Sequence, residues 1–227
     1  MTKSIKGTKT EQNLVASYMA ESAAYSRYTY YAAQAEKENY YPISEVFQET
    51  AANEMRHGKV FFKFLEGGSV DCQIGVDAGV IADTAANELR HGKVFFKFLE
   101  GGQVAVDLTV DAGVIGTTLE NLTTAAEEEQ REGVSAYVQA AETADAEGFP
   151  AIAAHFRAIA EVEARHEKRF RKFIEQIKAG TVWKREQPIE WQCLVCGYTY
   201  YGTEPPKACP ACDHPYQHYM PLDMDLD

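Results

Sequence analysis

The chain has 227 residues, 45% of them hydrophobic, and a formal net charge of −12 from 34 acidic and 22 basic residues. This acidic balance argues against nucleic acid or an anionic membrane as the main partner. The N-terminal MTKSIKGTKT lacks the apolar region of a secretory signal, and the chain contains no long apolar run that would span a membrane. We therefore expect a mainly helical cytoplasmic protein.

The first predicted helix covers residues 8–36, with Thr8 or Thr10 as its cap. Its apolar residues recur in alternating steps of four and three, which is typical of one buried helix face. A lone glutamate on such a face usually reaches water from the helix edge, but Glu21 lies in the middle between aromatic residues. The face consists of Leu14, Tyr18, Glu21, Tyr25, Tyr28 and Ala32.

A second helix follows the short connection at 37–42, so the two helices are expected to be antiparallel neighbours. Glu54 and His57 are three residues apart on its apolar face. Gly58 weakens a helix interior, and close approach of a neighbouring backbone would explain its presence. The face consists of Ile43, Phe47, Thr50, Glu54, His57, Phe61 and Phe64.

Residues 51–84 recur as residues 85–118 with most positions identical. Each copy holds half a helix, AANE(M/L)RHGKVFFKFLEGG, followed by a Val- and Gly-rich stretch that is predicted to be an extended crossover. Two copies are too few for a solenoid, so a tandem duplication is the better interpretation, although an assembly or cloning error would give the same pattern.

The duplication creates a second Glu-x-x-His pair, Glu88 and His91. We favour Glu54 and His57 as the ligand pair, because the first copy completes a full helix directly after the helix that carries Glu21. The opposite assignment stays open, because the second copy keeps the link into the third bundle helix.

The third helix is predicted over residues 118–146, and the fourth runs from about residue 150 to Gly180. The acidic run around Glu129 would suit a solvated face, but Glu129 and Glu132 lie at i and i+3 on the apolar side, with Tyr137 near it. The third helix presents Leu122, Ala125, Glu129, Glu132, Ala136 and Ala140. The fourth presents Ile152, Phe156, Ile159, Glu163, His166, Phe170, Phe173 and Ile177.

Carboxylates and imidazoles in an apolar bundle core are strongly disfavoured unless a cation neutralises them. One helix gives a single Glu, two give Glu-x-x-His and one gives Glu-x-x-Glu, which is the ligand pattern of ferritin-like di-iron and di-manganese proteins. Iron and manganese both suit these donors. The predicted ligands are Glu21, Glu54, His57, Glu129, Glu132, Glu163 and His166.

After a polar linker at 181–190, the last segment has a different composition and two Cys-x-x-Cys pairs. Such a short segment needs a metal to hold it together, and four thiolates suit either iron or zinc. A purely structural zinc ribbon is the alternative. The predicted ligands are Cys193, Cys196, Cys209 and Cys212. Cys72 is not expected to bind metal, because the equivalent position in the second copy of the repeat is Val106.

The chain resembles rubrerythrin over nearly its full length. The resemblance rests on KGTKTEQNL, RYTY at 27–30, FFKFLEGG, EVEARHEKRF and the CxxCGY…CPACDHP ending. It implies a ferritin-like four-helix domain at 1–180, enlarged by the duplicated segment, and a rubredoxin-like domain at 191–227. The implied cofactors are two iron ions bridged by oxo and carboxylate groups, and one iron on the four cysteines.

The resemblance also implies roles for single residues. His57 matches the residue that exchanges with a Glu132-type ligand when one iron moves on redox change. Tyr28 and Tyr137 match aromatic residues that are hydrogen-bonded around the site. The duplication is the departure from the family pattern, and it leaves the identity of the second helix open.

The leading functional hypothesis is a peroxidase that reduces hydrogen peroxide to water and protects against oxidative stress. Electrons would come through the four-cysteine iron from an NAD(P)H-linked rubredoxin reductase or similar donor, in a homodimer that exchanges helices. The alternative is a ferroxidase and iron store of the ferritin type, and a third hypothesis is a helical protein with a disabled bundle site.

Overall fold

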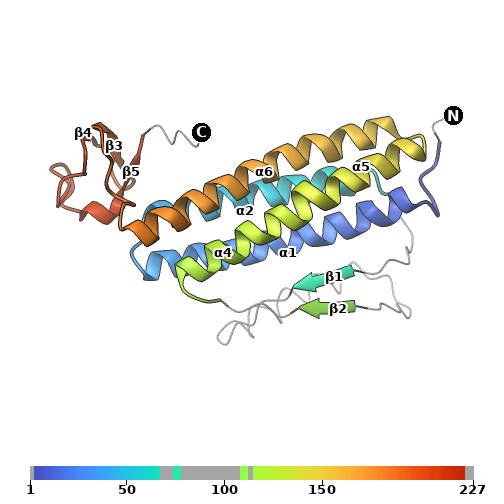
Figure 1. The fold of residues 1–227 in the computed structure, drawn as a ribbon, viewed down its shortest axis with the longest axis horizontal. Coiled ribbons are helices and arrows are strands. Elements are labelled where there is room, and N and C mark those ends of the chain that lie inside the picture. Colours follow the sequence, from blue (N-terminus) through green and yellow to red (C-terminus); the bar gives the residue numbers. More distant parts are fainter. Residues whose placement is uncertain (1–2, 67–73, 78–107, 112–114, 223–227) are drawn as a thin grey trace.

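The computed structural model describes residues 3–66, 74–77, 108–111 and 115–222, excluding the side chains of 74–77, 108–111 and 132–134. Long helical segments run side by side as a bundle, and a small β unit lies at one end (Figure 1). The bundle consists of α1 (Lys9–Lys37), α2 (Tyr41–Phe62), α4 (Thr118–Glu128), η1 (Glu129–Ala136), α5 (Tyr137–Ala146) and α6 (Pro150–Ala179). The predicted four-helix architecture is therefore confirmed.

Local sequence signals set the ends of these helices. The Thr8 hydroxyl accepts a hydrogen bond from the Glu11 N–H and caps α1, as predicted. Thr117 and Glu120 form a reciprocal capping box at the start of α4. Gly180 ends α6 in the left-handed conformation, with φ of 66°.

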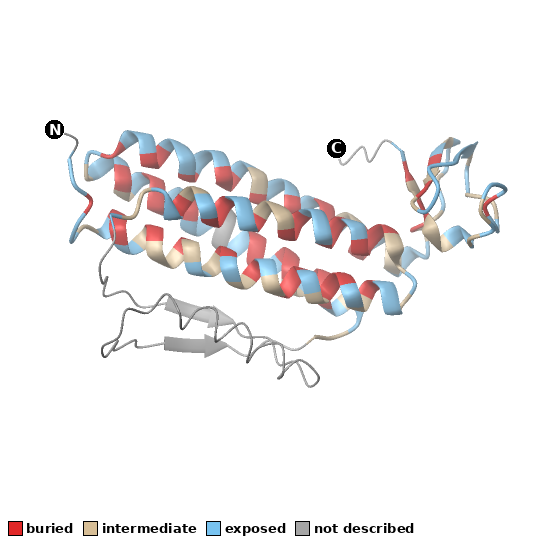
Figure 2. Cartoon of the chain, turned by 180° about the vertical axis from the view of Figure 1, so that it is seen from behind, coloured by how far each residue is buried: buried red, intermediate tan, exposed pale blue. Residues whose placement is uncertain are grey.

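The predicted apolar faces of α2 and α6 are buried along nearly their whole length, and buried residues form inward-facing stripes (Figure 2). One prediction for α1 is wrong: Tyr25 is 42% exposed. Ala24 is buried in its place. The α-helical period of 3.6 residues makes a step of three from Glu21 as favourable as a step of four, so the pattern alone did not separate these two positions.

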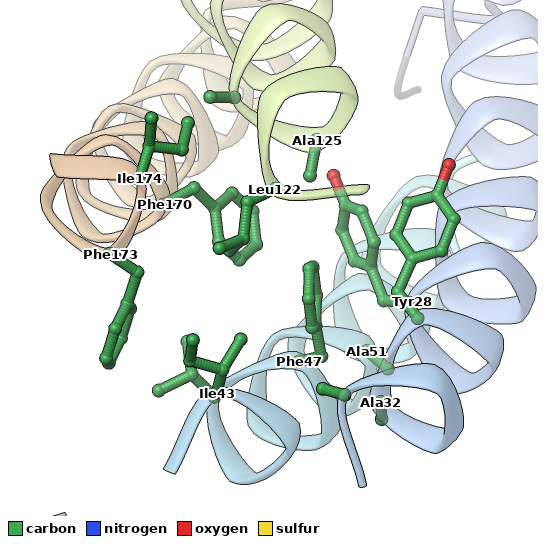
Figure 3. Packing of buried hydrophobic residues seen from close by; sticks show 14 of the residues in the cluster. Tyr28, Ala32, Ile43, Phe47, Ala51, Leu122, Ala125, Phe170, Phe173 and Ile174 are labelled. Carbon is green, nitrogen blue, oxygen red and sulfur yellow. The ribbon is translucent and has the colours of Figure 1, made fainter. Parts of the chain in front are cut away.

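The apolar core is divided into two clusters along the bundle axis. One cluster includes Phe47 of α2 and Phe170 of α6, whose ring centroids lie 5.2 Å apart, beside Tyr28 of α1 (Figure 3). The other includes Phe61 and Phe156, at the opposite end of the same helices. Glu21 of α1 and the Glu-x-x-His pairs of α2 and α6 fall between the two clusters in sequence, so apolar side chains close the site from both ends of the bundle.

The third bundle helix is not a continuous α-helix. A π-helix, η1, separates α4 from α5, and Tyr137 is buried beyond it whereas Ala136 is exposed. The prediction that Ala136 shares the inward face with Glu129 is therefore wrong. The wider π turn takes one extra residue into the helix and moves the inward position from 136 to 137.

Two short parallel strands, β1 (Ile74–Asp77) and β2 (Leu108–Asp111), pair beside the bundle (Figure 1). They belong to the two copies of the repeated segment, and their register pairs Val76 with Val110, which are equivalent positions of the repeat. The extended conformation predicted for the crossover is confirmed at these residues. Cys72, Glu88 and His91 lie outside the described residues.

The β unit consists of β3 (Ile189–Cys193), β4 (Thr199–Gly202) and β5 (Tyr219–Pro221) in the antiparallel order β4-β3-β5, with a short 3-10 turn, η2 (Tyr216–His218). The expected polar linker at 181–190 is not a free tether. Val182 is buried, and the Trp183 ring stacks on Tyr40 at 5.7 Å. None of the described helices combines the length and apolar composition that crossing a membrane requires.

Candidate metal centres

Six of the seven predicted bundle ligands lie together, all buried, at the middle of the bundle. They form two overlapping groups whose ligand atoms lie within 4.8 Å of one another. Glu54 and Glu163 belong to both groups, and such shared carboxylates are the geometry of a dinuclear site. The first group is Glu21, Glu54, His57 and Glu163, and the second is Glu54, Glu129, Glu163 and His166.

Both imidazoles present the same ring atom to the carboxylates. Nδ1 of His57 lies 2.8 Å from Glu163 and 3.2 Å from Glu54. Nδ1 of His166 lies 2.8 Å from the other oxygen of Glu163 and 3.2 Å from the other oxygen of Glu54. Each shared carboxylate therefore directs one oxygen to each group, as a bridging ligand does.

The ionisation of the cluster shows how strongly it demands positive charge. Burial lowers the pKa of His57, but its close contacts with the carboxylates of Glu163, Glu21 and Glu54 outweigh it and raise the pKa to about 12. Burial raises the pKa of Glu129 to about 8, against the opposing effect of the His166 imidazole 3.7 Å away. Burial likewise raises the pKa of Glu21 well above its usual range. The site must therefore take up cations, either protons or metal ions.

Several potential metal-ligand atoms of the cluster need a further partner. Oε1 of Glu54, both carboxylate oxygens of Glu163 and Nδ1 of His166 complete no hydrogen bond of standard geometry among the described residues. Buried polar atoms that meet only at ion-pair distance are costly unless a further partner satisfies them. Carboxylate and imidazole donors in this arrangement fit two iron or manganese ions.

Tyr28 and Tyr137 are hydrogen-bonded to Glu129 and Glu21, the carboxylates that belong to only one group each. The Tyr28 hydroxyl donates to Oε1 of Glu129 at 2.7 Å, and the Tyr137 hydroxyl donates to Oε1 of Glu21 at 2.6 Å. Each tyrosine therefore orients a carboxylate that belongs to only one group, which fixes its remaining lone pairs toward the centre.

Gly58 has the close neighbour that its position in a helix suggested. A Cβ atom added there would lie 3.4 Å from Cβ of Glu21 and 3.9 Å from the carbonyl oxygen of Tyr18. The absence of a side chain lets α1 and α2 approach at the level of the site.

Sequence reasoning missed a buried ion pair beside the site. Arg27 and Glu128, each 5% exposed, lie 3.0 Å apart between α1 and α4. The next residue of α1, Tyr28, contacts Glu129, the first residue of η1. Two neighbouring contacts therefore join α1 to the junction between α4 and η1. The acidic run was visible in the sequence, but no pattern indicated that Glu128 would turn toward Arg27. The side chain of Glu132 lies outside the described residues.

The four terminal cysteines form the second cluster, with their sulfur atoms within 4.8 Å of one another. Cys193 and Cys212 lie 3.8 Å apart, and Cys196 and Cys209 lie 3.6 Å apart. A tetrahedral site with metal–sulfur bonds of about 2.3 Å has sulfur–sulfur edges of about 3.8 Å, so the cluster is already close to the required shape.

The two cysteine knuckles have the same backbone design. Gly197 and Asp213, each directly after the second cysteine of a pair, have φ of 77° and 59°. Their N–H groups donate to the carbonyl oxygens of Cys193 and Cys209, at 2.8 and 2.9 Å. This left-handed turn lets both cysteines of a pair point to one metal position.

Comparison with known proteins agrees with both centres. The rubrerythrin family model matches residues 12–78, 73–174 and 120–190, and the model of the rubrerythrin rubredoxin-like domain matches residues 191–220. The rubrerythrin of Porphyromonas gingivalis is 40% identical over 222 residues, which cover 98% of this chain and 94% of the relative. The rubrerythrin of Nitratidesulfovibrio vulgaris is 38% identical over 223 residues, covering 98% and 99%.

Solved structures show the same fold. Fully reduced, all-ferrous nigerythrin superposes with a TM-score of 0.53 at 22% identity, covering 96% of this chain and 92% of that chain. Dithionite-reduced symerythrin from Cyanophora paradoxa has a TM-score of 0.53 at 19% identity, covering 78% and 90%. With its carboxylate–histidine di-iron cluster and its four-cysteine rubredoxin-like site, the chain belongs to the rubrerythrin family.

Proposed function

We propose that the protein is a peroxidase that reduces hydrogen peroxide to water at the bundle centre. The reaction consumes one peroxide, two electrons and two protons and yields two water molecules. The observation that carries the proposal is the pair of ligand groups joined by Glu54 and Glu163, which suits two metal ions side by side. A pair of reduced iron ions supplies the two electrons and the Lewis acidity that cleavage of an O–O bond requires.

The protein side chains have separate roles in this proposal. Glu54 and Glu163 hold the two metal positions together, while Glu21 and Glu129 each serve one position and are oriented by a tyrosine hydroxyl. The apolar clusters at both ends keep bulk water from the centre. We assign the exchange of ligands on redox change to His57 and Glu132, following the family resemblance.

The four-cysteine site is proposed to return electrons one at a time, because a single iron on four thiolates cycles between two oxidation states. An NAD(P)H-linked rubredoxin reductase or a similar protein would be the donor. We propose a homodimer in the cytoplasm as the working form. The ferritin-type alternative requires a large hollow cage, so a native mass of a dimer or tetramer would discard it.

A single-turnover experiment tests the proposal. The iron-loaded protein is reduced anaerobically with dithionite, freed of excess reductant and mixed in a stopped-flow spectrometer with two equivalents of hydrogen peroxide per chain, enough to accept the three electrons of its three iron ions. We expect rapid reoxidation of the bundle centre, followed by reoxidation of the four-cysteine iron, whose visible absorbance returns. The Glu54→Ala variant, which keeps the four-cysteine site, is the matched control and should lose the fast phase.

One result would overturn the proposed activity. If peroxide left the reduced bundle centre unchanged while dioxygen oxidised it quickly, the protein would be an oxidase or ferroxidase rather than a peroxidase.

A further inference from the structure

A tyrosine is buried against the four-cysteine cluster. Tyr219 is fully buried and packs with Trp191, Cys193 and Cys209 in the small apolar cluster of the β unit. It lies on β5 directly opposite Cys193 of β3 in the antiparallel register. A phenol in such a place needs an acceptor for its O–H, because a buried donor left unsatisfied costs about 1–3 kcal/mol.

The group that the hydroxyl faces is a cysteine sulfur. The hydroxyl completes no hydrogen bond of standard geometry among the described residues, although it lies within interaction distance of Cys209. A cysteine that binds a metal ion is a thiolate, and a thiolate is a stronger hydrogen-bond acceptor than a thiol.

The two knuckles differ in this contact. The backbone N–H of Tyr198 contacts Cys196, and the backbone N–H of His214 contacts Cys212, at equivalent positions of the two pairs. The second knuckle also has a side-chain hydroxyl beside it, because Tyr219 lies within interaction distance of Cys209. A hydroxyl that is fully enclosed beside a metal-ligating sulfur acts in a low dielectric, where its dipole has a large effect.

We propose that Tyr219 donates an O–H···S hydrogen bond to the Cys209 thiolate and thereby raises the reduction potential of the iron held by the four cysteines. Reduction adds one electron to the iron and moves no proton, so the four-thiolate site goes from a charge of −1 to −2. A donor to sulfur stabilises the more negative state more strongly, and hydrogen bonds to cluster sulfurs are known to set such potentials. This inference is independent of the activity at the bundle centre.

The test is the reduction potential of the full-length Tyr219→Phe protein, loaded with iron and titrated with dithionite and mediators in a spectroelectrochemical cell. The ring and its packing are kept, so only the hydroxyl is lost. We expect the equilibrium constant for reduction to fall about tenfold, which is a decrease of about 59 mV for a one-electron couple. The sulfur-to-iron absorption bands should shift in the same variant.

Tyr201→Phe is the matched control, because Tyr201 lies on β4 of the same unit and is 67% exposed. It removes the same atom, and the potential should stay at the wild-type value. An unchanged potential in Tyr219→Phe, or an equal change in both variants, would overturn the proposal.

A second measurement needs no variant. In wild-type protein loaded with an NMR-active cadmium isotope, the Tyr219 hydroxyl proton should show scalar coupling to the metal through the Cys209 sulfur. A hydroxyl proton that exchanges rapidly with water and shows no coupling would contradict the hydrogen bond even if the Tyr219→Phe protein failed to fold.

Discussion

At the scale of single residues, the site depends on two carboxylates that serve two positions at once. Glu54 and Glu163 each direct one oxygen to His57 and the other to His166. Replacing a residue that serves both metal positions should reduce metal binding more than replacing a residue that serves a single position. Glu54 lies in the first copy of the repeat, and its counterpart in the second copy is Glu88. Substituting each residue separately therefore tests which copy forms the centre.

We predict that Glu54→Ala removes nearly all iron from the bundle centre, whereas Glu88→Ala leaves it at the wild-type level. The physical reason is that the bridging oxygens of Glu54 contribute to both ligand groups. Iron per chain is measured by atomic spectroscopy, with the visible absorbance of the four-cysteine iron as an internal reference. Equal iron loss from both variants would mean that the two copies share the site or exchange places.

At the scale of helices, a buried ion pair joins α1 to α4 immediately before the π-helix. Buried ion pairs contribute little net stability, because the loss of hydration offsets their attraction, but removing one partner is costly. The Arg27–Glu128 pair is nearly inaccessible to water on both sides. It fixes the end of α4, and with it the start of η1, where Glu129 joins the site.

We predict that Arg27→Met lowers the free energy of unfolding by about 3–5 kcal/mol, because the Glu128 carboxylate then stays buried without this guanidinium. The double variant Arg27→Met with Glu128→Leu should recover most of the loss, because an apolar pair of similar volume replaces the charges. Chemical denaturation of all three proteins measures both effects. A double variant no more stable than Arg27→Met would show that the cost comes from lost packing and not from the loss of the guanidinium charge beside Glu128.

The helices also show how far sequence periodicity reaches. The faces of α2 and α6 were predicted because their apolar residues follow one unbroken α-helical period, and their ionisable residues then had to face the core. The exposure of Ala136 was not predicted, since a π turn changes the period within a helix and leaves no signature in the pattern. The pairing of Arg27 with Glu128 was missed for a related reason: it depends on how two helices meet.

At the scale of the whole molecule, the β unit contacts the bundle through aromatic rings at the N-terminal end of α2. Tyr40 stacks on Trp183, and Tyr41 stacks on His218 with ring centroids 3.8 Å apart. The sequence predicted the two metal-binding parts from their separate compositions. It gave no sign of these contacts, because Tyr40 and Tyr41 lie in a segment predicted to be a short connection and Trp183 lies in the predicted polar linker.

The central claim is that the buried carboxylates of the bundle hold two iron ions side by side. Anomalous X-ray scattering at the iron edge, on crystals of the iron-loaded protein, tests it most directly. We predict two peaks between α1, α2, η1 and α6, both bound by Glu54 and Glu163, and a third among the four cysteines. A bundle without anomalous peaks, or with a single ion bound by only one of the two groups, would contradict the account.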